Sequence, residues 1–329
     1  MTVGRTAGLS DPGRRRRRNE DAYVLQPPLF AVADGMGGAQ AGEVASRLAV
    51  EALKEDSSGG EGVERVAALV QSANRRIWER AGEDASAQGM GTTMTVGLVG
   101  QDEVAFGHVG DSRAYRIRDG EVEQLTEDHS LVGELMRSGK LSPEEAEAHP
   151  QRSVITRALG TDPDVDVDTF SVDARPGDVF LICSDGLTIM VGEEEILEEV
   201  ERSRGDLDGA AKALVRLANK GGGEDNITVV FFEIVEAGAK EEQTAVLAPS
   251  QADAGHPDDE DTLDELDDLR PLEVPPAVDT MVVPPEQAAA LRAEPNPLDR
   301  TAKRVLVTVL IVLMLAAFAL VVYWWGLAS

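Results

Sequence analysis

The chain of 329 residues is strongly acidic, with 60 Asp and Glu against 31 Lys and Arg and a net charge of −29. This charge argues against nucleic-acid binding, which depends on neutralising phosphates, so we expect no nucleic-acid partner. A hydrophobic fraction of 42% can fill the core of an enzyme-sized domain. The single cysteine, Cys183, has no intrachain partner, and its apolar neighbours predict a buried strand in a reducing compartment.

The first 235 residues are predicted to form the folded domain. No apolar segment of signal-peptide length precedes it. Short apolar runs bounded by Gly and Asp predict six strands, at Leu29–Ala33, Met94–Leu98, Val104–His108, Ala114–Ile117, Val179–Cys183 and Ile227–Phe232. Apolar residues recurring every three or four positions predict four helices, at Glu43–Lys54, Val63–Glu83, Ser130–Ser138 and Leu207–Asn219.

The links between strands indicate how the strands pair. Short glycine-containing links at 100–103 and 107–113 predict hairpins, and therefore antiparallel strands, rather than crossover units. An antiparallel sheet covered by long amphipathic helices predicts a layered α+β domain.

The composition changes twice beyond residue 235. Residues 236–304 are rich in Pro, Ala, Asp and Glu, which predicts a disordered acidic linker. Residues 305–327 carry no charge and are long enough to cross the hydrocarbon core, which predicts a transmembrane helix in contact with membrane lipid. A buried core helix is the alternative, although such helices are shorter and amphipathic. Basic residues before this segment and aromatic residues at its far end predict a single-pass protein of the inner membrane with a cytoplasmic catalytic domain.

Carboxylates recur where predicted strands end or Gly-rich turns begin. Five clusters share this pattern: Asn19–Asp21, Asp34–Gly38, Gly110–Arg113, Ser184–Leu187 and Asp225–Asn226. Strand ends deliver side chains to a sheet edge where several can converge, and oxygen ligands suit Mg²⁺ or Mn²⁺. Any single Asp-Gly pair is more often an ordinary turn. The five together indicate a metal site, and no zinc-like Cys/His spacing competes with it.

In this order the motifs resemble the type 2C, metal-dependent protein serine/threonine phosphatases, in their bacterial membrane-anchored form. The resemblance covers roughly residues 5–235 and rests on D-x-G-x-x-R-x-x-N-E-D at 11–21, DGMGG at 34–38, GDSR at 110–113, SDGL at 184–187 and DN at 225–226. It implies a four-layer αββα sandwich of two antiparallel sheets flanked by helices. It also implies hydrolysis of phosphoserine and phosphothreonine on proteins by water that two Mn²⁺ or Mg²⁺ ions activate, opposing a serine/threonine kinase.

The resemblance also assigns roles to individual residues. A pair of metal ions would be held by the bridging ligand Asp34, the Gly35 carbonyl, Glu20 or Asp21, Asp185 and Asp225. Asp111, together with Asp185, would hold a third and weaker ion. Arg16 would bind the substrate phosphate. The other arginines of the run Arg14–Arg18 are interpreted as solvated charges, with a patch for anionic lipid or nucleic acid as the alternative.

Met36 stands where many eukaryotic members of the family have a histidine proposed as general acid. A thioether cannot donate a proton, so we expect the leaving group to be protonated by water held by the metal ions. His108, His129 and His149 are the alternative acids, although a lone histidine is more often structural.

Residues 127–160 form a polar, partly helical insertion between strand regions. By resemblance this segment is a flap that helps to select protein substrates, with Gly139 and Pro143 allowing it to move. An ordinary pair of surface helices fits the sequence equally well.

Two other functions fit parts of the sequence. A catalytically weak relative that binds phosphoproteins is the main alternative, although every predicted metal carboxylate is present. A calcium-loaded structural surface protein would need secretion and repeated Asp spacing, and neither is visible. The expected partners are phosphorylated proteins, including a membrane serine/threonine kinase whose effective concentration a membrane tether would raise. Thr244 and Thr280 are candidate phosphorylation sites recognised by partner domains.

Overall fold

A computed structural model describes residues 1–37, 41–56, 59–84, 87–142, 145–146, 149–203, 205–238 and 281–282. Two antiparallel sheets form its centre. The five-stranded sheet has the order β1 (Thr2–Asp11), β12 (Ile227–Val235), β11 (Val179–Cys183), β7 (Arg113–Arg118) and β8 (Glu121–Gln124). The six-stranded sheet has the order β10 (Asp168–Asp173), β6 (Glu103–Val109), β5 (Met94–Val99), β3 (Leu29–Met36) and β2 (Asp21–Gln26), with β4 (Gly91–Thr92) paired to β3.

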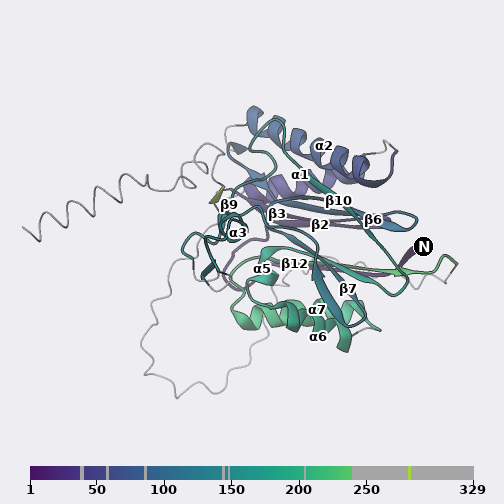
Figure 1. Cartoon of the computed structure of the whole chain (residues 1–329). Helices are drawn as coiled ribbons and strands as arrows, with labels where there is room; N and C mark the ends of the chain where they lie inside the picture. Colours follow the sequence, from purple (N-terminus) through teal and green to yellow (C-terminus); the bar gives the residue numbers. More distant parts are fainter. Residues whose placement is uncertain are drawn as a thin grey trace, which may run out of the picture. The chain divides into compact units, whose positions relative to one another are not determined.

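Long helices cover the outer face of each sheet (Figure 1). The helices α1 (Ala41–Glu55) and α2 (Gly62–Glu83) pack on the six-stranded sheet through apolar residues spaced three and four apart. The helices α6 (Glu193–Arg202) and α7 (Leu207–Gly221) pack on the five-stranded sheet in the same way. These layers confirm the predicted αββα sandwich of two antiparallel sheets flanked by helices.

Aromatic side chains fill the space between the sheets. Phe30 from one sheet stacks on Phe232 from the other, with ring centroids 4.3 Å apart, and Phe180 stacks on Phe232 at 5.0 Å. All three rings are fully buried. Burial of such rings is the largest hydrophobic contribution that single side chains make, so this stack holds the two sheets in a fixed relation.

The predicted strands and helices are present, and the structure adds others. The six apolar runs lie in β3, β5, β6, β7, β11 and β12. The four helical patterns lie in α1, α2, α7 and the short α3 (Leu131–Arg137). The strands β1, β2, β8 and β10 and the acidic helix α6 were not predicted, because their sequences carry too many polar residues for the apolar signal to stand out.

One of the two predicted hairpins is wrong. The link at 100–103 does join the antiparallel strands β5 and β6. The link at 107–113, however, leads from β6 in one sheet to β7 in the other. Gly110 makes this possible: its φ is +114°, and a Cβ there would lie 2.5 Å from the Cβ of Thr93. Asp111 therefore lies where the chain crosses between the sheets.

Several predictions fall outside the described residues. These are most of the linker, residues 305–327, Gly38, Pro143, Thr244 and Thr280. No helix within the described ranges combines the length and the apolarity needed to span a bilayer. The short strand β13 (Met281–Val282) pairs in parallel with β9 (Val154–Ile155), which belongs to the segment 127–160.

Candidate metal centre

Four separate parts of the fold bring the predicted carboxylates together. Asp34 lies near the end of β3, and Asp21 opens β2 directly opposite it in the antiparallel pairing. Asp185 begins the short helix α5 (Asp185–Thr188), two residues after β11 ends. Asp225 lies in the turn before β12, and Asp111 lies in the crossing between the sheets.

Burial and mutual repulsion raise the pKa values of these carboxyls. The pKa of Asp34 is held well above its usual value by burial and then by the charges of Asp21, Asp185, Asp225 and Asp111. Burial, followed by the charges of Asp111 and Asp225, does the same to the pKa of Asp185. Buried carboxylates that repel one another are costly to ionise unless a cation compensates their charge. The five carboxylates thus form one interacting cluster, although they are distant in sequence.

Two further carboxyls of the cluster show the same effect. Burial raises the pKa of Asp21 to about 6, although hydrogen bonds from Thr228 and Ser184 oppose the shift. Burial also raises the pKa of Asp111 to about 7, with Asp128 adding to the shift and Arg113 opposing it. Without a cation, these two side chains therefore hold their protons to a higher pH than an ordinary aspartate does.

The cluster contains carboxylate oxygens that the protein does not satisfy. One Oδ1 atom in each of Asp21, Asp111 and Asp185 is buried and has no hydrogen-bond partner in the described structure. A buried polar atom without a partner costs free energy, so these three atoms indicate a missing ligand. A set of ligands made only of oxygen atoms suits hard cations such as Mg²⁺ and Mn²⁺, so the residues of the cluster fit a divalent cation of this kind.

The side chains do not form a complete ligand cage by themselves. Within the described ranges, no group of three or more His, Cys, Asp or Glu side chains is arranged to hold one metal ion as it stands. Mg²⁺ is commonly held by one or two carboxylates and several waters. The fit to such an ion therefore rests on the donor chemistry and on the unpartnered oxygens.

The structure distinguishes between the neighbours Glu20 and Asp21. The Oδ2 atom of Asp21 accepts hydrogen bonds from Ser184 Oγ at 2.9 Å and from Thr228 Oγ1 at 2.6 Å, which orients its carboxyl within the cluster. The backbone of Glu20 instead joins three elements: its carbonyl accepts from Gly35 N–H and Ser46 Oγ, and its N–H donates to Asn226 Oδ1. The charge of Asp21 is the largest of the carboxylate charges that raise the pKa of Asp34.

Gly35 lies where the chain leaves no room for a side chain. A Cβ on Gly35 would lie 2.2 Å from the Gly42 carbonyl oxygen and 2.5 Å from the Glu20 carbonyl oxygen. Real Cβ contacts are never this close, so any other residue would move either α1 or the segment that leads into β2. The glycine therefore lets two backbones approach the position next to Asp34.

Arg16 reaches the cluster from the N-terminal loop. Its Nη2 donates to Asp225 Oδ2 at 2.7 Å, and the whole side chain is 21% exposed. The other carboxylate oxygen of Asp225 accepts from the Asn226 backbone N–H at 2.8 Å. Arg16 thus lies at the edge of the carboxylate cluster and is partly open to solvent.

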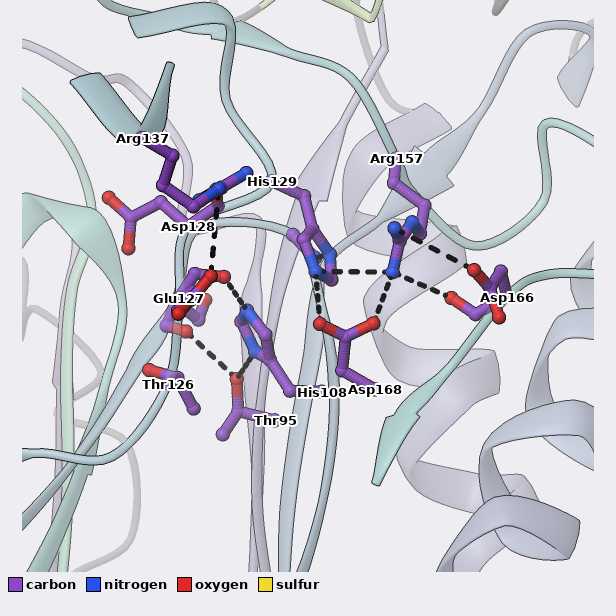
Figure 2. Close-up of polar contacts among 12 residues, drawn as sticks. Thr95, His108, Thr126, Glu127, Asp128, His129, Arg137, Arg157, Asp166 and Asp168 are labelled. Carbon is purple, nitrogen blue, oxygen red and sulfur yellow. Dashed lines mark hydrogen bonds and ion pairs between the residues drawn. The ribbon is translucent and has the colours of Figure 1, made fainter. Parts of the chain in front are cut away.

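The histidines proposed as alternative acids have structural partners, which Figure 2 shows for His108 and His129. His108 is fully buried, its two ring nitrogens contact Thr95 Oγ1 and the Glu127 carbonyl, and burial lowers its pKa to about 3. His129 accepts a hydrogen bond from Gly110 N–H through Nδ1 and contacts Asp168 through Nε2. Burial followed by the charge of Arg157 lowers the pKa of His129. His149 Nδ1 accepts from a backbone N–H two residues along the chain.

Sequence analysis missed the residues that position Asp111. Arg113 binds Asp128 through two hydrogen bonds of 2.9 and 2.8 Å, and the backbone N–H of His129 donates to the Gly110 carbonyl at 2.7 Å. Both contacts attach the start of the segment 127–160 to the chain on either side of Asp111. Arg113 belongs to the GDSR motif and His129 was a candidate acid, but the sequence did not indicate that these residues and Asp128 position Asp111.

Comparison with known proteins identifies the family. The sequence profile described as Protein phosphatase 2C matches residues 14–218, and the chain belongs to this family. The serine/threonine protein phosphatase PstP of Mycobacterium tuberculosis is 42% identical over 237 residues, which are 71% of this chain and 46% of PstP. The serine/threonine phosphatase stp of Listeria innocua is 42% identical over 236 residues, 68% of this chain and 93% of that protein.

A solved structure shows the same fold with metal ions. The catalytic domain of PstP in complex with two manganese ions is 39% identical, has a TM-score of 0.66, and covers 72% of this chain and all of that one. The chain thus matches less than half of full-length PstP but nearly the whole of the Listeria phosphatase.

Proposed function

We propose that this protein removes phosphate from phosphoserine and phosphothreonine on proteins, as a metal-dependent phosphatase. The observation that carries the proposal is the cluster of buried carboxyls with three unpartnered oxygens, from Asp21, Asp111 and Asp185. The family match and the names of the relatives support the same reaction. All the expected carboxylates are present, which favours an active enzyme over a relative that only binds phosphoproteins.

Several residues of the cluster would act together as ligands of the metal ions. Two Mn²⁺ or Mg²⁺ ions would supply an activated water and neutralise charge on the phosphate. Asp34 would lie between them, with Asp185, Asp225, Asp21 and the Gly35 carbonyl completing the set. The backbone of Glu20 would help to hold Gly35 and Asn226 in place beside these ligands. Asp111, close to Asp185 in the cluster, is the proposed ligand for a third ion.

Arg16 would hold the phosphate group of the substrate. A guanidinium carries five donors in a fixed plane, so it can keep its hydrogen bond to Asp225 and still offer N–H groups to a phosphate oxygen. Its partial exposure leaves a path for a dianionic substrate to reach it. An arginine at this position also offsets some of the repulsion that the carboxylates exert on that substrate.

The segment 127–160 is proposed to help select protein substrates. It is joined to the metal side at both ends: the His129 N–H donates to the Gly110 carbonyl, and Leu159 exchanges backbone hydrogen bonds with Thr92, whose hydroxyl donates to the Asp34 carbonyl. Between these ends, Arg152 pairs with Glu224, next to Asp225, at 3.3 Å. Gly139, at the end of α3, has a φ of +68° with open space around it. The segment therefore has fixed ends and a glycine between them.

Hydrolysis in the presence and absence of metal tests the proposal. The full-length chain should hydrolyse p-nitrophenyl phosphate and a phosphothreonine peptide in Mn²⁺, and EDTA should abolish both activities. Asp34→Asn and Asp185→Asn should be inactive, whereas Asp164→Asn, an exposed aspartate elsewhere, should retain full activity. Phosphopeptide binding without any hydrolysis by the wild-type protein would instead support the phosphoprotein-binding relative.

The anchoring of the protein is a separate proposal. Its domain organisation would be a catalytic domain at 1–235, an acidic linker at 236–304 and a transmembrane helix at 305–327, with the catalytic domain in the cytoplasm. A kinase in the same membrane is the proposed substrate, because tethering raises the local concentration of a neighbour. The full chain should remain with membranes after alkaline washing, whereas a chain ending at residue 304 should be released. Recovery of both in the soluble fraction would rule out the anchor.

A further inference from the structure

The run of arginines around Arg16 is fixed to the rim of the metal centre. The backbone N–H groups of Arg14 and Arg15 both donate to the Gly223 carbonyl, at 2.8 and 3.1 Å. The buried side-chain amide of Asn226 donates to the carbonyls of Pro12 and Arg18, at 3.0 and 2.9 Å. The loop is therefore held at both ends and in its middle against the segment that carries Asp225.

The side chains of this loop divide into two groups. Arg16 turns to Asp225 and is half-buried, and Arg18 turns to Glu43 at 3.9 Å, whereas Arg14, Arg15 and Arg17 are exposed on the solvent side. These three exposed side chains, here called the basic rim, lie within two residues of Arg16. A peptide whose phosphate is held at Arg16 would place its flanking residues within reach of the basic rim.

The charge of the rest of the protein makes this position significant. The chain has a net charge of −29, and the centre itself consists of carboxylates. A substrate with acidic residues beside its phosphorylated residue would be repelled by such a surface unless cations lay at the point of entry. Arginine suits this role because its planar donors match both carboxylate and phosphate oxygens.

We propose that the basic rim selects phosphorylated segments that carry additional negative charge, from acidic side chains or a second phosphate, within a few residues of the reacting phosphate. This inference rests on the proposed phosphatase function and adds a substrate class to it. The proposal gives a role to arginines that the sequence alone indicated to be solvated charges. Attachment to anionic lipid is disfavoured, because a membrane bound at the rim would cover the approach to Arg16 and Asp225.

The test compares two phosphothreonine peptides that differ only in their flanking residues, one with glutamates and one with glutamines. The full-length chain in Mn²⁺ at low salt should prefer the glutamate peptide by about tenfold in kcat/KM, since each exposed ion pair contributes up to about fivefold. The preference should appear mainly in KM and should shrink as salt is raised.

A triple variant, with Arg14, Arg15 and Arg17 each changed to Gln, should lose this preference and keep its rate on p-nitrophenyl phosphate. The matched control changes three exposed arginines of α2 and α6 to Gln, with the same loss of charge, and should keep the preference: Arg75, Arg80 and Arg202. Retention of the preference by the rim variant, or its loss in the control, would overturn the inference.

Other outcomes are equally decisive. Equal rates of the wild-type protein on both peptides would overturn the basic rim as a selector and leave the phosphatase function standing. Binding of phosphatidylglycerol vesicles that the rim variant loses, with the peptide preference unchanged, would assign the arginines to lipid. Failure of the wild-type protein to hydrolyse any phosphate ester in Mn²⁺ would remove the proposed function and the inference together.

Discussion

Replacing Asp111 with asparagine should make the metal-free protein more stable and its response to metal ions weaker. Asp111 is buried, one of its carboxylate oxygens lacks a partner, and burial with the nearby charge of Asp128 raises its pKa from 3.8 to about 7. At pH 8 the carboxyl is ionised in both the folded and the unfolded chain. The folded protein then carries the cost of that buried charge, and asparagine keeps the shape without the charge.

The shift in pKa sets the size of the effect. A difference of about three units corresponds to about 4 kcal/mol at about 1.4 kcal/mol per unit. The amide of asparagine also needs hydrogen-bond partners in a buried site, so we expect a net gain of about 2 kcal/mol. For a domain of this size such a gain corresponds to a rise in Tm of about 4–8 °C in EDTA.

The dependence on pH distinguishes this cause from better packing. Between pH 4 and pH 7 the folded wild-type protein binds more protons at Asp111 than the unfolded chain does, so this one group contributes a fall in stability of about 1.4 kcal/mol per pH unit as pH rises. The free energy of unfolding of the variant should fall less steeply over the same pH range, because the variant releases about one proton fewer on unfolding. Calorimetry of both proteins in EDTA measures the slopes, with Asp164→Asn as the control at an exposed aspartate. Equal slopes, or a less stable variant at pH 8, would show that the charge at Asp111 is not costly.

Three further predictions concern other parts of the molecule. Because the buried His108 is neutral with a pKa of about 3, this group should contribute a loss of about 2 kcal/mol of stability as pH falls from 6.5 to 5. The difference in stability between the wild-type protein and His108→Gln, measured by urea unfolding at both pH values, should change by about that amount in favour of the variant. Gly13→Ala should raise the Mn²⁺ concentration needed for activity, because its Cβ would lie 2.2 Å from the Asp225 carbonyl oxygen at a φ of +74°. Gly120→Ala, at a φ of +81° with open space, is the control that isolates the backbone strain of about 1–2 kcal/mol in thermal unfolding. Addition of Mn²⁺ to EDTA-treated protein should raise the free energy of unfolding by about 2.7 kcal/mol at a hundredfold excess over Kd, measured by calorimetry.

These predictions share one physical basis. The carboxylates of the cluster are unfavourable for folding and favourable for holding cations, which is a common conflict between stability and activity. The aromatic stack around Phe232 and the apolar faces of the four long helices offset that cost.

The sequence by itself determined the local structure and the chemical type of the centre. Apolar runs such as Val179–Cys183 predicted strands because a strand buried on both faces needs continuous apolar residues. The spacing of apolar residues predicted α2 for a similar reason, since only one face of that helix is buried. Acidic residues at strand ends indicated oxygen ligands for a hard cation, and the ordered motifs led to the correct family.

Only the tertiary structure decided which groups meet and what their surroundings do to them. A glycine in the link at 107–113 would suit a hairpin as well as a crossing between the sheets. Only the structure shows that the link crosses and that Thr93 leaves no room for a Cβ at Gly110. Asp21 enters the cluster through partners more than 160 positions away in the chain, Ser184 and Thr228. Burial, repulsion and pKa depend on such distant contacts, and a pattern of neighbouring residues contains no information about them.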